Sequence, residues 1–86
     1  MAYTSFVAFF SSSTTLKAGF VTSKKVGNAV NRNKARRRMR ALFASYEQQL
    51  LIGNYIFVAK IELHEKNFLQ LKKDFDFALK RLEVLT

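Results

Sequence analysis

The sequence has 86 residues, and its 15 Lys and Arg against six Asp and Glu give a formal net charge of +9. This length predicts one small domain over residues 1–86, and a content of 49% hydrophobic and 14% aromatic residues is too high for a disordered chain. Since cysteine is absent, a disulfide scaffold, a thiolate metal site and a cysteine nucleophile are all excluded.

Two short segments rich in aromatic and β-branched residues open the chain, at residues 6–10 and 16–22. The polar run at residues 11–15, Ser-Ser-Ser-Thr-Thr, separates them and suits a loop. This pattern predicts two strands joined as a hairpin.

A helical pattern follows from about residue 28 to residue 49. Its apolar residues recur at spacings that place them on one stripe: Ala35, Met39, Leu42, Phe43 and Tyr46. The pair Gly53 and Asn54 is expected to stop the helix. The nearly continuous apolar run at residues 55–61 is typical of a central strand buried on both faces.

A second helix is predicted from Asn67, because Asn67 and Gln70 have the spacing of a capping box. Its inner face is expected to contain Phe68, Leu71, Phe75, Ala78, Leu79 and Leu82. The predicted fold class is therefore α+β, a two-layer α/β sandwich of order β-β-α-β-α. The strands before and after the first helix should lie parallel, joined by a crossover.

Both faces of the predicted sheet are apolar or aromatic, since residues of alternating parity along each strand point to opposite sides. Two amphipathic helices cover only one face. The other face needs a ligand, a partner chain or a helix from elsewhere, and self-association through this face is one of the alternatives.

The positive charge is concentrated in one stretch of the chain. Between residues 17 and 40 there are nine basic residues and no acidic one, whereas the rest of the sequence has six of each. Five of the six arginines lie between Arg32 and Arg40. Such a local excess points to a polyanionic partner rather than to general solubility, because its field attracts phosphates.

On a helical wheel, most of these cations lie opposite the apolar stripe, and Arg32 falls beside it. Arginine suits phosphate recognition because its planar fork can donate two hydrogen bonds and can stack on a base. Gly27 and Asn28 precede the helix, so its free N–H groups should form an anion site beside Lys24 and Lys25. The competing interpretation is a solvated basic face or a localisation-type basic run.

The segment from Gly19 to Arg40 reads GFVTSKKVGNAVNRNKARRRMR and resembles the signature of the bacterial ribonuclease P protein component. Its SKKVGNAV stretch followed by an arginine-rich run is highly specific to that family. A weaker resemblance continues through residues 54–60 and the second helix, so that it covers residues 5–82.

The resemblance implies a subunit of a ribonucleoprotein endonuclease that removes the 5′ leader from precursor tRNA. In that family the RNA subunit performs the Mg²⁺-dependent hydrolysis, so we expect no catalytic residue and no cofactor bound by the protein alone. The implied partners are the ribonuclease P RNA subunit and precursor tRNA, and the implied crossover is left-handed. RNA-binding residues expected from the charge pattern and the resemblance together are Ser23, Lys24, Lys25, Gly27, Asn28, Arg32, Asn33, Lys34, Arg36, Arg37, Arg38 and Arg40.

The chain departs from the family pattern in three places. Lys34 replaces an arginine in the family's Arg-Asn-Arg triplet, and Lys60 replaces the arginine of an Ala-Arg pair. Family members usually begin with a basic helix that, with the sheet, forms a cleft for the leader, whereas this sequence starts almost at its first strand. The uncovered sheet face is where we expect that helix to belong.

Five sheet aromatics are candidates for stacking unpaired bases, with core packing as the competing role: Phe6, Phe10, Phe20, Tyr55 and Phe57. No cluster of metal ligands and no facing carboxylate pair is found. One alternative function is a general RNA-binding or ribosome-associated module. A protein acting on anionic membranes is disfavoured because the basic helix lacks an exposed apolar stripe. With no signal peptide, the cytoplasm is the expected location.

Overall fold

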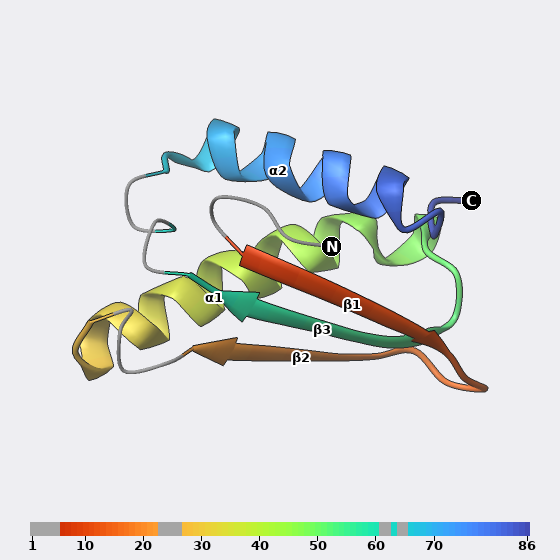
Figure 1. Ribbon diagram of the computed structural model, residues 1–86, viewed down its shortest axis with the longest axis horizontal. Helices are drawn as coiled ribbons and strands as arrows, with labels where there is room; N and C mark the ends of the chain where they lie inside the picture. Colours follow the sequence, from red (N-terminus) through yellow and green to blue (C-terminus); the bar gives the residue numbers. More distant parts are fainter. Residues whose placement is uncertain (1–5, 23–26, 61–62, 64–65) are drawn as a thin grey trace.

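The computed structural model describes residues 6–22, 27–60, 63 and 66–86. Its elements, in chain order, are β1 (Phe6–Ser12), β2 (Lys17–Thr22), α1 (Ala29–Tyr46), the 3-10 turn η2 (Glu47–Gln49), β3 (Gly53–Ala59) and α2 (Phe68–Arg81). Figure 1 shows a three-stranded sheet with β3 in the middle and the two helices packed against it. The α+β class and the order β-β-α-β-α are thereby confirmed.

The predicted hairpin of β1 with β2 is wrong, because β3 lies between them. β1 pairs antiparallel with β3, from Phe6 opposite Ala59 to Ser12 opposite Gly53. β2 pairs parallel with β3, which confirms the predicted crossover through α1. Strands two positions apart in a sheet are separated by about 10 Å, a distance that residues 13–16 can span. The short connection between β1 and β2 therefore leaves room for β3 between them, and for this reason it did not require the two strands to pair.

Only one face of β3 is buried, so the prediction of burial on both faces is also wrong. Its buried residues alternate with more exposed ones such as Ile56, which is 45% exposed. The helix pattern ends earlier than Gly53, since α1 stops at Tyr46 and η2 at Gln49. Gly53 instead starts β3, where a Cβ atom would lie 2.5 Å from the Phe10 ring and 2.6 Å from the Ser11 carbonyl oxygen.

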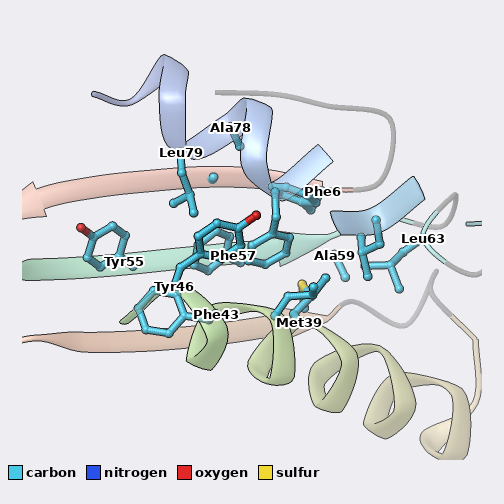
Figure 2. Packing of buried hydrophobic residues seen from close by; sticks show 14 of the residues in the cluster. Phe6, Met39, Phe43, Tyr46, Tyr55, Phe57, Ala59, Leu63, Ala78 and Leu79 are labelled. Atoms are coloured by element: carbon cyan, nitrogen blue, oxygen red, sulfur yellow. The ribbon is translucent and has the colours of Figure 1, made fainter. Parts of the chain in front are cut away.

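The core lies between the sheet and the two helices, with the Phe57 ring at its centre (Figure 2). Phe57 stacks on Phe75 of α2 with ring centroids 4.8 Å apart, and it meets the edge of Phe43 of α1 at 5.8 Å. The predicted stripe of α1 is buried throughout. In α2 the core contacts begin one turn after the helix start, so Phe68, at 54% exposure, is not on the inner face.

Side-chain caps define where both helices begin. The Asn28 side chain accepts a hydrogen bond from the Asn31 amide at 2.9 Å. At the start of α2 the capping box is complete and confirms the prediction: the Gln70 amide donates to Asn67 Oδ1 at 2.8 Å, and the Asn67 amide donates to Gln70 Oε1 at 2.9 Å.

Candidate nucleic-acid interface

The helix α1 presents its cations on the side away from the core. Ala35 and Met39 are fully buried and fix which side of the helix faces the sheet. Asn33, Lys34, Arg37 and Arg40 are exposed, whereas Arg32, Arg36 and Arg38 are half-buried. The burial of the stripe thus forces a contiguous set of positive groups into solvent.

Arg36 and Arg40 lie along the flank of α1 that faces β2. The Arg36 guanidinium donates to Thr22 Oγ1 at 3.0 Å, and it also donates to Asn33 Oδ1. The Arg40 guanidinium lies over the Phe20 ring, 5.6 Å from its centroid. These contacts hold the two side chains in defined positions, and because none of the partners is an anion, both side chains keep their positive charge.

The start of α1 is shaped by Gly27, whose φ of +122° is disfavoured for residues with a side chain. Arg32 reaches back from the helix, and its Nη1 donates to the Gly27 carbonyl oxygen at 3.0 Å. This contact explains how a charged residue beside the apolar stripe is accommodated. The candidates Ser23, Lys24 and Lys25 lie outside the described residues.

Arg38 points to the other flank of α1, toward the connection between β3 and α2. Its Nη1 donates to the Leu63 carbonyl oxygen at 3.2 Å and its Nη2 to that of Lys66 at 2.5 Å. Both partners are neutral, so this arginine too keeps its charge. Across residues 27–60, 63 and 66–86, no ion pair involves a cation of α1, and the helix remains a concentrated source of positive potential.

The sheet face away from the helices forms a second exposed surface, which we call the open face: Val7, Phe9, Ser11, Lys17, Gly19, Val21, Asn54, Ile56 and Val58. Phe9 is 53% and Ile56 45% exposed. Around Gly19, where a Cβ atom would meet nothing within 4 Å, the surface forms a hollow of about 410 Å³ bordered by Lys17 and Asn54. The floor of this surface is apolar, and polar groups lie at one end. The prediction of an uncovered sheet face is confirmed for the described part of the chain, in which no element packs on this side.

The stacking prediction needs correction. Phe6, Tyr55 and Phe57 are at most 1% exposed, because their strand positions point toward the helices, so their rings have no face free for a base. Phe10 and Phe20 are half-buried on that same covered side, and their stacking on bases stays a prediction. The aromatic ring on the open face is Phe9, which the sequence analysis left out although its parity is opposite to that of Phe10.

The described residues contain no group of three or more His, Asp or Glu side chains that could hold a metal ion. In the same part of the chain, no helix is long and apolar enough to cross a membrane. A helix whose charged residues are all cationic, beside an exposed apolar sheet face, is typical of an RNA-binding α+β protein.

Comparisons with known proteins identify the family. A model of the family described as Ribonuclease P matches residues 2–83. The ribonuclease P protein component of Nitratiruptor sp. is 44% identical over 78 residues, covering 91% of this chain and 72% of that protein. The one from Paramagnetospirillum magneticum is 40% identical, covering 81% of this chain and 54% of that protein. The solved ribonuclease P protein of Staphylococcus aureus superposes with a TM-score of 0.88 at 28% identity, over 100% of this chain and 82% of the other.

The chain therefore belongs to the bacterial ribonuclease P protein family. Membership makes it the protein subunit of ribonuclease P, an RNA-catalysed endoribonuclease, and implies 5′ processing of precursor tRNA together with the RNA subunit.

Three participants in the site were missed by the sequence analysis. They are the Thr22 hydroxyl and the carbonyl oxygens of Leu63 and Lys66, which accept from α1 arginines 14 to 28 residues away. No periodic signal connects residues so far apart. Only the pairing of β2 with β3 and the packing of α2 bring them to the flanks of α1.

Proposed function

We propose that the outward face of α1 binds phosphates of the ribonuclease P RNA subunit, and that the chain acts in this way as one RNA-binding domain in the cytoplasm. The supporting observation is the exposed set Asn33, Lys34, Arg37 and Arg40, unopposed by any ion pair within the described part of the chain. Exposed guanidinium groups on a rigid helix can donate paired hydrogen bonds to phosphate oxygens at little entropic cost.

The open face is proposed as the surface for the leader of precursor tRNA. Its Phe9 ring and apolar floor suit an unpaired base, while Lys17 supplies a cation for the backbone. A second copy of the chain is the competing occupant of this face. We further propose that Mg²⁺ acts in the assembled RNA–protein enzyme, where it would supply the hydrolytic chemistry, and that the protein alone binds no cofactor.

The test is the salt dependence of RNA binding. Each phosphate contact contributes about 0.7–0.9 to the slope of log affinity against log salt, and if about six side chains of the chain neutralise phosphates, the slope is roughly −4 to −5. Replacing two outward cations, Arg37→Ala with Arg40→Ala, is expected to flatten the slope by between about one and two units. The matched control removes the same charge from α2, Lys73→Ala with Arg81→Ala, and should leave the slope unchanged.

A second measurement distinguishes a ribonuclease P subunit from a general RNA-binding module. It compares leader removal by the RNA subunit at low Mg²⁺ with and without the protein. The wild-type protein is expected to stimulate cleavage, and the α1 double variant to do so only at higher protein concentration. Tight binding without stimulation would instead support a general RNA-binding module. Equal slopes for the two double variants, with circular dichroism showing intact folds, would remove α1 from the interface.

A further inference from the structure

The basic residues of α1 differ in what they contact, and the difference follows their exposure. Lys34 and Arg37 are exposed, and among the described residues neither side chain takes part in a hydrogen bond or an ion pair. By contrast Arg32, Arg36 and Arg38 are half-buried, and each donates to an oxygen of the protein. A side chain already bound to the protein is less available to a phosphate than one in solvent.

Arg36 and Arg38 each use both Nη atoms, and Arg38 differs in that its two acceptors are both backbone carbonyl oxygens outside α1. One belongs to Leu63 and the other to Lys66, at 3.2 and 2.5 Å. The planar fork of arginine suits this bridge because it holds two donor nitrogens at a fixed separation, whereas lysine presents one nitrogen on a flexible stem. Arg38 thus joins α1 to the connection that leads into α2.

The two carbonyl groups lie at positions that fix where α2 begins. Leu63 is fully buried in the core, and the Lys66 amide donates to the Leu63 carbonyl oxygen at 3.2 Å. Lys66 directly precedes Asn67, the cap of α2. Holding these two carbonyl groups therefore orients the first turn of α2 relative to α1.

On the helical wheel, Arg36 and Arg38 flank the buried stripe, each roughly 80° from its centre. Arg36 binds Thr22 at the end of β2, and Arg38 binds the connection on the other side. Tethers on both flanks resist rotation of α1 about its axis. They thereby keep Lys34, Arg37 and Arg40 turned outward.

We propose that Arg38 is a positioning residue: it fixes the orientation of α1 and the start of α2, while the outward cations contact RNA. The RNA contacts of the outward cations rest on the function proposed above, whereas the positioning role of Arg38 does not. The arginine-rich run of the sequence is thus divided between holding the helix and binding the nucleic acid.

The experiment compares Arg38→Met with Arg37→Met, which remove the same charge and keep a helix-forming stem. Arg38→Met is expected to lower the melting temperature by roughly 5–15 °C through loss of two charged hydrogen bonds, and to speed amide exchange at Gln70 and Leu71. Its slope of log RNA affinity against log salt should match the wild type. Arg37→Met should keep the melting temperature and flatten the slope by about 0.7–0.9.

A measurement on the wild-type protein covers the case in which Arg38→Met fails to fold. Hydrogen bonds at both Nη atoms slow rotation of the guanidinium group, so Arg38 should give resolved Nη resonances in the free protein that do not shift when RNA is added. Averaged Nη signals for Arg38, or an Arg38→Met slope as flat as that of Arg37→Met with an unchanged melting temperature, would overturn the proposal. If neither variant changes the slope, the RNA-binding role of α1 fails, and resolved Nη signals with a lowered melting temperature would still support the positioning role.

Discussion

The helices α1 and α2 pack against the same face of one sheet, but their charges are arranged in opposite ways. In α2 the cations Lys80 and Arg81 lie in the last turn, where the helix dipole favours them, and Lys80 pairs with Asp76 at 2.9 Å. In α1 there is no acidic residue in the first turn and no basic residue in the last. Its arginines instead begin in the first turn, where the dipole opposes them.

The difference fits a helix α2 whose charges stabilise it and a helix α1 whose cations are available to the RNA partner proposed above. Like charges along α1 repel one another in the free protein, and the burial of its stripe offsets that repulsion. A polyanion bound to the outward face of α1 would remove this repulsion between its cations. Local conflicts of this kind are expected at functional sites, because elsewhere nothing would retain them.

The largest expected effect on stability comes from Phe57, the core residue that both helices contact. Phe57→Ala removes the ring that contacts both Phe75 of α2 and Phe43 of α1. We expect a loss of about 3–5 kcal/mol in the free energy of unfolding, measured by urea denaturation, because a large buried ring leaves a cavity. A loss of that size approaches the whole stability of a small domain.

The neighbouring residue provides the matched control. Ile56 lies on the open face and is 45% exposed, so Ile56→Ala should cost less than about 1 kcal/mol. If Ile56→Ala destabilised the chain as much as Phe57→Ala, the open face would have to be covered in solution, and the picture of a one-sided core would be wrong.

The same pair of residues illustrates what sequence patterns could and could not predict. Alternation correctly placed Ile56 and Phe57 on opposite faces, and helical spacing predicted the buried stripe of α1 and the capping box of α2, since these signals are local. Which sheet face the helices cover, and that β3 separates β1 from β2, depend on contacts between distant segments. For the same reason the RNA-binding residues were predicted as one set, although Arg38 contacts residues 25 and 28 positions away.

Salt is expected to act on the two helices differently. Between about 0.1 and 1 M salt the screening length falls from about 10 to about 3 Å, which weakens repulsion along α1. The protection of the Ala35 and Met39 amides against hydrogen exchange should rise about two- to fivefold. This corresponds to a gain of roughly 0.5–1 kcal/mol in the free energy of opening α1. Leu79 in α2 serves as the internal control and should change little. Protection of α1 that falls with salt would mean that its cations are engaged in attractive pairs.

The smallest expected effect concerns Asp76, which links the two helices. The Lys80 ammonium donates to its carboxylate and lowers the Asp76 pKa below its ordinary value, with a further contribution from the Tyr46 hydroxyl, which donates at 3.3 Å. Burial, followed by the charge of Asp76, raises the pKa of Tyr46. Because the folded-state pKa of Asp76 is depressed, its stabilisation is fully present above the unfolded pKa and is lost as the pH falls below about 4, through the folded-state value.

The Lys80 and Asp76 side chains are 65% and 40% exposed, so solvent screening limits the effect to below about 0.5 kcal/mol. The stability difference between wild type and Asp76→Asn should therefore be small at neutral pH and should shrink further between about pH 4 and 2. Titration of the Asp76 carboxyl carbon by NMR gives the pKa directly. In Lys80→Met it should move back toward the ordinary value, and an unchanged pKa would assign the depression to Tyr46, making the link between α1 and α2 stronger than the pair within α2.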